Sequence, residues 1–410
     1  MTRAMRGVRG VAGCLALLTT TAMVFGDWPQ WRGTHGDAKV EFNAPPTWPK
    51  QLTQKWKTTV GLGDSTPALV GDRLYVFTRD GADEVATCLD ANTGKQIWQQ
   101  KYPPKAMVTG AAASHPGPRS SVAVANGKVI TFGISEILSC WDAESGKLAW
   151  RKEFNDEFKQ PFPRFYTGTS PLVVDNLCIV QIGGSGKGAV AAFDLSTGDM
   201  KWKADSDGPA YATPALMVMG ESKIVVAQTE KSLVGLSLTD GKELFKVAAA
   251  TARMAQNAPT PVIDGSMIIY TGQGSGTHAI EIKKEGDGSA TAEKWNNAQI
   301  GTTFNTPVLK DGKLYGISDR GNIYCMDAGT GKSLWTDTTR HTNFGSIVDG
   351  GSVLLALTQK AELIAIEPSD KAYKELAKFH VSDSDTYAYP VVSGNKIFIK
   401  DKDSVTLFGT

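Results

Sequence analysis

Eight polar side chains stand just ahead of short apolar runs that recur along the chain, and they are its candidate binding residues. They are Asp64, Arg119, Tyr166, Tyr211, Asn257, Asn305, Asn343 and Tyr387. Arginine and tyrosine are common anchors of protein interfaces, whereas a calcium site prefers several charged oxygen donors, and this set has one carboxylate. The residue types therefore predict a surface that binds a protein, a peptide or a glycan, with no catalytic and no metal-ligating residue.

A glycine-rich run from Gly183 to Gly188 resembles a phosphate-binding loop. Such a loop opens a helix with a Lys-Ser/Thr pair, whereas the residues that follow here, Ala189 to Asp194, have the composition of a strand. The run is therefore predicted to be the turn of a β-hairpin. His115, His278 and His341 lack the spacing of metal ligands, so each is expected to be an isolated surface histidine.

The elements that position these residues are copies of one unit, which is clearest in residues 306–335. Its apolar runs are separated by the turn signals Asp311-Gly312, Asp319 to Asn322 and Gly329 to Lys332. Short runs separated by Gly, Asp and Asn are typical of an antiparallel meander of strands. A single meander with two apolar faces needs copies of itself on either side.

The copies share an Asp, a Gly and a Trp at a fixed spacing. The clear copies are Asp90-Gly94-Trp98, Asp142-Gly146-Trp150, Asp194-Gly198-Trp202 and Asp327-Gly331-Trp335. Ser237-Gly241-Phe245 is a weaker copy, Glu281 to Trp295 is a stretched one, and Glu367 opens a degenerate one. Cys88, Cys140 and Cys325 lie two residues before the repeat Asp, where a small buried position is expected, because Ala192 takes it in the third copy.

A Ser or Thr followed by Pro precedes most copies. The pairs are Thr66-Pro67, Ser170-Pro171, Thr213-Pro214, Thr260-Pro261 and Thr306-Pro307, with Tyr389-Pro390 in the same place near the C-terminus. A repeated Pro indicates an edge strand, because its missing N–H cannot serve a two-sided ladder. The innermost strand of a propeller blade is such an edge.

These counts predict an all-β fold, an eight-bladed β-propeller of four-stranded antiparallel blades that spans residues 54–410 as one domain. The last blade has only three strands before the chain stops, so Gln54 to Thr58 is predicted to be its outer strand and to close the ring. The linkers 101–119 and 153–166 both lead into inner strands and are expected at the same mouth. There they either carry function or cap the hydrophobic rim.

The N-terminal residues differ from the repeats. Residues 1–26 combine Arg3, Arg6 and Arg9 with an apolar run, which predicts a secretory signal peptide and export to the periplasm or the cell exterior. Residues 27–53 form a lead-in rich in Trp and Pro, which is expected to clamp the outside of the propeller or to offer a docking strip. No later stretch is apolar enough to span a membrane.

Charge argues against one class of partner. The chain has 43 Lys and Arg against 42 Asp and Glu, whereas nucleic-acid-binding proteins usually show a basic excess or stripe. A partner is therefore expected among envelope proteins, peptides or glycans, and the protein itself is expected to be a monomer.

The repeat, visible in residues 89–98 and 326–335, resembles the pyrroloquinoline-quinone (PQQ) repeat of the eight-bladed propellers found in quinoprotein alcohol dehydrogenases and in the BamB family of outer-membrane assembly factors. The resemblance covers nearly all of the mature chain. It implies that the repeat tryptophans dock each outer strand against the next blade. These tryptophans are Trp56, Trp98, Trp150, Trp202, Trp295 and Trp335.

The resemblance leaves two functions open. The quinoprotein enzymes imply PQQ with calcium, a base beside the substrate, a stacking Trp and often two adjacent cysteines, and this sequence has no Cys-Cys pair. No catalytic residue carries over, and no cofactor is predicted. The sequence favours an exported, non-catalytic binding or scaffold protein of the cell envelope, and the alternative is a PQQ- and calcium-dependent dehydrogenase.

Overall fold

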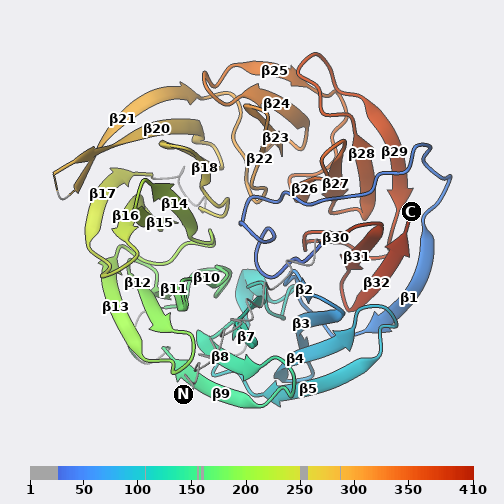
Figure 1. Ribbon diagram of the computed structural model, residues 1–410, viewed down its shortest axis with the longest axis horizontal. Coiled ribbons are helices and arrows are strands. Elements are labelled where there is room, and N and C mark those ends of the chain that lie inside the picture. The colour runs from blue at the N-terminus through green and yellow to red at the C-terminus, as the bar shows by residue number, and fades with distance from the viewer. Residues whose placement is uncertain (1–25, 107, 155–156, 158–160, 250–256, 287) are drawn as a thin grey trace, which may run out of the picture.

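The structure, a computed structural model, describes residues 26–410 except 107, 155–156, 158–160, 250–256 and 287. Its strands form eight four-stranded sheets arranged as a ring around a central axis (Figure 1). All paired strands are antiparallel, because tight turns join consecutive strands of each blade. The predicted eight-bladed propeller is confirmed. Residues 1–25 of the predicted signal peptide lie outside the described part of the chain.

The first four blades follow the chain without interruption. They consist of β2 (Ala68–Val70), β3 (Arg73–Asp80), β4 (Asp83–Asp90) and β5 (Gln96–Tyr102); β6 (Ala123–Ala125), β7 (Lys128–Phe132), β8 (Ile137–Asp142) and β9 (Leu148–Glu153); β10 (Leu172–Val174), β11 (Leu177–Gly184), β12 (Lys187–Asp194) and β13 (Met200–Ser206); and β14 (Ala215–Met219), β15 (Ser222–Gln228), β16 (Ser232–Ser237) and β17 (Glu243–Ala248). A short 3-10 helix, η1 (Gly110–Ala112), lies in the linker between the first two blades.

The next three blades repeat this order, and the eighth combines both ends of the chain. They consist of β18 (Val262–Asp264), β19 (Met267–Gly272), β20 (Gly276–Glu285) and β21 (Gly288–Asn297); β22 (Val308–Lys310), β23 (Lys313–Ile317), β24 (Ile323–Asp327) and β25 (Ser333–Thr336); β26 (Gly345–Asp349), β27 (Leu354–Thr358), β28 (Glu362–Ile366) and β29 (Glu375–His380); and β30 (Val391–Ser393), β31 (Lys396–Lys400), β32 (Ser404–Gly409) and β1 (Thr53–Thr59).

The ring is closed by β1, which pairs with β32 as the outer strand of the eighth blade. The pairing runs from Thr53 opposite Gly409 to Thr59 opposite Ser404. This confirms the predicted closure. Joining the two ends of the chain in one sheet leaves no blade incomplete and covers a sheet edge that would otherwise be open.

Each repeat tryptophan donates a hydrogen bond from its indole Nε1 to a backbone carbonyl of the next blade, at 2.8 to 3.2 Å. The pairs are Trp56 to Ala91, Trp98 to Ala143, Trp150 to Leu195, Trp202 to Leu238, Trp295 to Ala328 and Trp335 to Ser369. Five of these rings lie over the repeat glycine of the next blade, which has no side chain to displace them. A flat ring with a polar edge can cover an interblade seam and satisfy a carbonyl at once.

The Ser and Thr residues that precede the inner strands join neighbouring blades. Their hydroxyl oxygens accept backbone N–H groups of adjacent inner strands: Tyr389 to Thr66, Thr66 to Ser121, Ser121 to Ser170, Ser170 to Thr213, and Thr260 to Thr306. These bonds satisfy donors at sheet edges that have no ladder partner. In the Ser/Thr-Pro pairs the Pro thus marks the edge strand, and the Ser or Thr hydroxyl links that strand to the next blade.

The cysteine position of the repeat is confirmed as a small buried slot. Cys88, Cys140 and Cys325 are fully buried, as is Ala192 in the third blade. All three thiols are free. Burial raises the pKa of the Cys88 and Cys325 thiols to about 11, so they remain neutral.

The first part of the lead-in occupies the centre of the ring, where the sequence suggested a position on the outside (Figure 1). Its second part runs outward, and there Trp48 packs on Phe379 of the outer strand β29 with ring centroids 5.8 Å apart. Trp28 is fully buried and pairs with Leu69 of the first inner strand. Arg32 is also buried, and its Nη2 donates to the carbonyl of Pro307 at 2.8 Å. The apolar rings find more surface to bury among eight converging inner strands than on the polar rim, which explains the difference.

Candidate binding site at the mouth

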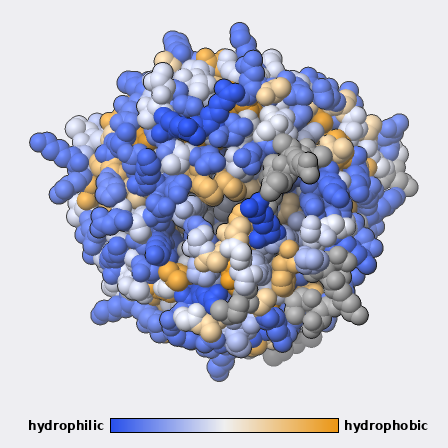
Figure 2. All heavy atoms as spheres, turned by 180° about the vertical axis from the view of Figure 1, so that it is seen from behind, coloured by the Kyte–Doolittle hydropathy of each residue, from blue (hydrophilic) through white to orange (hydrophobic). Residues whose placement is uncertain are grey.

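The strand order places the candidate residues on one face. Every inner strand begins at the same face, so the linkers that enter it and the hairpins between second and third strands gather there; we call this face the mouth. The lead-in reaches the opposite end, where Gly71 in the turn after β2 donates to Asp27 at 2.9 Å. Figure 2 shows the face opposite to that of Figure 1, and most of its surface is hydrophilic.

The two long linkers meet at the mouth, as expected. The backbone N–H of Thr109, from the first linker, donates to the hydroxyl of Tyr166, from the second, at 3.2 Å. Tyr166 adopts a left-handed backbone with φ 61°, which is rare for a bulky residue. Its ring stacks on Phe162 with centroids 5.3 Å apart.

Asp64 and His115 form the charged centre of the mouth. Asp64 Oδ2 lies 2.8 Å from His115 Nδ1, and both side chains are half-buried. The hydrogen bond to Asp64 raises the pKa of His115, because the carboxylate stabilises the imidazolium. Arg119 holds this loop from behind, since its Nη2 donates to the His115 carbonyl at 2.7 Å.

Tyr387 is fixed beside this pair by two polar neighbours. Its hydroxyl accepts a hydrogen bond from Gln359 Nε2 at 2.9 Å and donates to Asp385 Oδ2 at 3.1 Å. Gln359 also donates to Asp385 at 3.0 Å. Burial raises the pKa of Tyr387 to about 12, so it stays a neutral phenol.

Four rings form a continuous contact at the mouth, which we call the aromatic band. His115 meets Tyr387 edge-on with centroids 4.7 Å apart, and Tyr387 meets Phe344 edge-on at 5.2 Å. Phe344 stacks on Phe304 at 3.9 Å. The four residues come from four different linkers and all are half-buried. Partly exposed aromatic residues held rigidly are typical of binding surfaces.

A cavity of about 500 Å³ opens beside one end of the aromatic band. Among its lining residues are Asp64, Ser114, His115, Tyr387 and Lys402. They offer hydrogen-bond donors, acceptors and a ring in one concave place, which is the usual make-up of a ligand site.

Arg119 and Tyr211 lie deeper. Burial lowers the pKa of Arg119, while Asp64, Tyr211 and Tyr166 favour its charge. Its Nη1 is buried without a hydrogen-bond partner. The Tyr211 hydroxyl accepts the backbone N–H of Phe165 at 2.9 Å, so it fastens the second linker.

Two of the predicted binding residues are buried and hydrogen-bonded to the backbone. Asn257 is buried, and its Nδ2 donates to the carbonyls of Thr229 and Ala249 at 2.9 and 3.0 Å. Asn305 is buried as well, and its Oδ1 accepts the N–H of Ile317 at 2.9 Å. The structure therefore leaves neither amide at the solvent-exposed mouth. Asn343 is half-buried and precedes Phe344 of the aromatic band.

Sequence reasoning missed five mouth residues. They are His115, Phe304, Phe344, Gln359 and Asp385. Phe304 and Phe344 each adjoin a predicted Asn, so their position before the inner strand was the available signal. No sequence signal pointed to His115 or Asp385 as binding residues, because the side chains they contact are distant in sequence.

The expectation of isolated surface histidines was wrong for two of the three. His115 is paired with Asp64 as described. His341 is buried, with its Nε2 2.8 Å from Asp337 Oδ2. His278 is half-buried, and its Nε2 lies 2.8 Å from the Ser275 carbonyl.

The glycine-rich run is the predicted hairpin turn, with Gly184 opposite Lys187 between β11 and β12. Its backbone N–H groups already have an anionic partner within the chain, since Gly186 N donates to Glu230 Oε2 at 2.7 Å. The carboxylate of the next blade thus takes the place that a phosphate would occupy in a P-loop.

The fold and the mouth together define an eight-bladed propeller with tryptophan-docked blades and a mouth that gathers aromatic and polar side chains. Residues 81–337 match the sequence pattern of a family described as "Outer membrane protein assembly factor BamB". The chain belongs to this family of PQQ-like eight-bladed propellers, which confirms the resemblance.

Individual relatives fall into two groups. The outer membrane protein assembly factor BamB of Yersinia pestis is 26% identical over 322 residues, which cover 77% of this chain and 68% of the relative. Methanol dehydrogenase [cytochrome c] subunit 1 of Paracoccus denitrificans is 26% identical over 262 residues, which cover 60% of this chain and 39% of the relative. The structure of a europium-containing methanol dehydrogenase has a TM-score of 0.71 at 14% identity and covers 94% of this chain and 98% of that one. The last comparison concerns the fold alone.

We tested whether the mouth fits PQQ with calcium. Calcium takes several hard oxygen ligands, and the lining of the cavity at the mouth offers two carboxylates. One is paired with the His115 imidazole, and the other, Asp385, accepts hydrogen bonds from Gln359 and Tyr387. The described residues contain no group of three His, Cys, Asp or Glu that can hold a metal. The donor set does not fit calcium.

The described residues also contain no helix long and apolar enough to cross a membrane.

Proposed function

We propose that this protein is a non-catalytic binding protein of the cell envelope, which holds a protein, peptide or glycan partner at its mouth. The observation that carries the proposal is the aromatic band, with its cavity and its rim of Asp64, Gln359 and Asp385. Half-buried rings contribute contact area, and fixed polar groups contribute specificity. The relatives named outer membrane protein assembly factor support an envelope role.

Neighbouring side chains already hold the rings of the aromatic band in position before a partner binds. Tyr387 is held by Gln359 and Asp385, and Phe344 is stacked on Phe304, so these side chains lose little conformational freedom when a partner binds. The rim carries acceptors on Asp64 and Asp385 and a donor on Lys402. Such a surface suits a polar partner with some apolar area.

A photo-crosslinking amino acid at position 344 tests the proposal in the intact envelope. Leu148, a 48% exposed residue on the outer strand β9, is the matched control position. The partner captured at 344 but not at 148 is then titrated calorimetrically against wild-type protein and Tyr387→Ala. The variant is expected to bind about tenfold more weakly, which corresponds to the loss of a hot-spot residue. Equal affinity of the two proteins would contradict a binding role for the mouth.

The alternative, a PQQ-dependent dehydrogenase, is favoured by the methanol dehydrogenase relatives. Calorimetric titration of the mature protein with PQQ and calcium decides between the two functions. Tight, calcium-dependent binding would replace the binding-protein proposal. No heat from a folded sample is the result we expect, because the carboxylates of the mouth are engaged by neighbouring side chains.

A further inference from the structure

The inner strand of the fourth blade is unusually long. Six of the eight inner strands have three residues, whereas β14 (Ala215–Met219) and β26 (Gly345–Asp349) have five. An inner strand is the edge of its sheet. Additional residues therefore present more backbone N–H and C=O groups to the channel, unless another segment covers them.

The end of β26 is covered by the chain itself. Lys39 of the lead-in forms a parallel bridge with Asp349, the last residue of β26. Val40 N donates to the Asp349 carbonyl at 2.9 Å, and Asp349 N donates to the Ala38 carbonyl at 2.8 Å. The inner edges of this propeller thus accept an extended polypeptide.

The lead-in pairs with two further inner edges. Trp28 forms an antiparallel bridge with Leu69 in β2, and Phe42 forms a parallel bridge with Gly394 after β30. The three bridges lie in the first, seventh and eighth blades. One extended segment therefore covers one side of the ring by backbone pairing.

The long strand on the other side lacks such a partner. In the part of the chain that the structure describes, β14 pairs with β15 alone. Near its end, Val218 is 54% exposed, which exceeds the exposure of Ile97, Leu148 and Met200 on outer strands. An apolar side chain on an open strand edge marks a place for strand addition.

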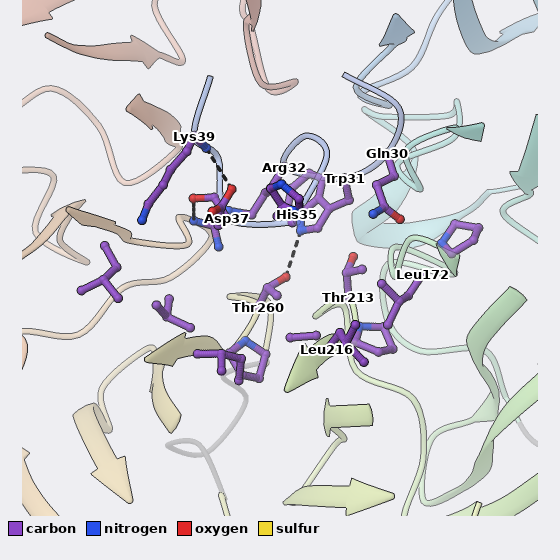
Figure 3. A pocket seen from close by; sticks show the side chains of 18 residues that line it. Gln30, Trp31, Arg32, His35, Asp37, Lys39, Leu172, Thr213, Leu216 and Thr260 are labelled. Atoms are coloured by element: carbon purple, nitrogen blue, oxygen red, sulfur yellow. Dashed lines mark hydrogen bonds between the residues drawn. The ribbon is translucent and has the colours of Figure 1, made fainter. Parts of the chain in front are cut away.

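Space for a strand is present along β14. A cavity of about 260 Å³ separates the lead-in from the inner strands of the third to sixth blades, and Ala215 and Leu216 form part of its wall (Figure 3). At the other end of the strand, Val218, Met219 and Leu244 line a groove of about 620 Å³. The two spaces share β14 as a wall, and a partner segment matching its five residues would be roughly 17 Å long.

We propose that an extended segment of a partner polypeptide adds to the open edge of β14 as a further strand. Its backbone pairs with β14, and its apolar side chains enter the cavity beside Leu216 and the groove beside Val218. A polypeptide is the occupant because it carries donors and acceptors at the strand repeat, as the lead-in does at β26. This surface is separate from the mouth, so the proposal does not depend on the mouth-binding function.

The test uses the mature protein and a fluorescent peptide of alternating Val and Thr, flanked by lysines for solubility. A second peptide of the same sequence carries N-methyl groups on alternate residues, which remove backbone donors along one edge. Binding is measured by fluorescence anisotropy, and hydrogen–deuterium exchange locates the protected residues. Val218→Lys is compared with Leu148→Lys, which places the same charge on an exposed outer strand.

We expect protection of residues 215–219 and no binding of the N-methylated peptide. Val218→Lys should weaken binding by about tenfold or more, because the ammonium would be buried by the added strand, while Leu148→Lys should bind as wild type does. Equal binding of both peptides, protection confined to the mouth, or equal affinity of the two lysine variants would each overturn the proposal. Protection of 215–219 by an oligosaccharide instead of the peptide would also overturn it.

Discussion

The repeat glycine is predicted to serve the interblade seam as well as the turn, and Gly198→Ala tests this. Gly198 has φ +75°, and a Cβ there would lie 2.7 Å from Cδ2 of the Trp150 ring. Gly220 is the matched control, because it has φ +60° and open space around the position of a Cβ. Both substitutions place an L side chain in the left-handed region, and only the first displaces a ring.

The magnitudes follow from these two effects. A left-handed backbone costs an alanine about 1–2 kcal/mol, which is the whole expected loss for Gly220→Ala. Displacing a packed ring adds about 1–3 kcal/mol of overpacking, and it also strains the bond from Trp150 to the Leu195 carbonyl. Gly198→Ala should therefore lower the free energy of unfolding by about 2–5 kcal/mol.

Urea unfolding followed by far-UV circular dichroism measures the difference, with the slope checked for each variant. Gly198→Ala is also made in a Trp150→Ala background. There its cost should fall to that of the backbone alone, which gives a coupling energy of about 1–3 kcal/mol between the two sites. Equal losses for Gly198→Ala and Gly220→Ala, or no coupling to Trp150, would show that the repeat glycine does not make room for the ring.

Three further predictions concern the core and the channel. Trp202→Phe replaces the indole by a smaller aromatic ring and leaves the Leu238 carbonyl without its donor, so urea unfolding should show a loss of about 1–3 kcal/mol from the hydrogen bond in addition to the cost of the lost ring volume. An unchanged midpoint would mean that neither contributes. Burial raises the pKa of Glu136 to about 8. The stability that its protonated form contributes is therefore complete below the ordinary carboxyl pKa, and it is lost as the pH rises from there through the raised pKa of about 8. Glu136→Gln should therefore lose less stability than wild type between about pH 5 and about pH 9 in urea titrations, and identical pH dependence would count against it. Trp28→Ala should lower the free energy of unfolding by about 3–5 kcal/mol, measured in the same way; a fully stable variant would argue against a fixed lead-in.

The blades could be predicted because their signals are local. Turn residues lie between short apolar runs, and an Asp, a Gly and a Trp recur in register, so each copy specifies its own meander. Ring closure by β1 followed from the three strands left at the C-terminus. The hairpin at Gly183 to Gly188 followed from the strand that succeeds it.

The lead-in could not be placed from its composition. Three tryptophans among residues 27–49 predict packing, but not the surface they pack on. Its contacts reach far along the chain, as in the bond from Trp31 Nε1 to Thr260 Oγ1 at 2.9 Å. Only the closed ring brings these inner strands together around a space that the rings can fill.

The mouth shows the same division. Asp64, Tyr166, Tyr211 and Tyr387 stand before inner strands, and strand direction alone puts them on one face. Asn257 and Asn305 share that position, yet nearby backbone groups engage their amides. Whether a polar side chain faces solvent or a carbonyl depends on linker conformation, which the repeat does not encode.

Four features of the fold follow from the sequence alone: the repeat, the number of blades, the antiparallel order within each blade and the strand that closes the ring. These features depend on residues that are close in sequence or on the two chain ends. The contacts between blades are visible only in the folded ring: the pairing of Asp64 with His115, the aromatic band, the first part of the lead-in within the channel and the open edge of β14. Such contacts join residues from separate linkers and blades, and only the closed ring fixes the distances between them.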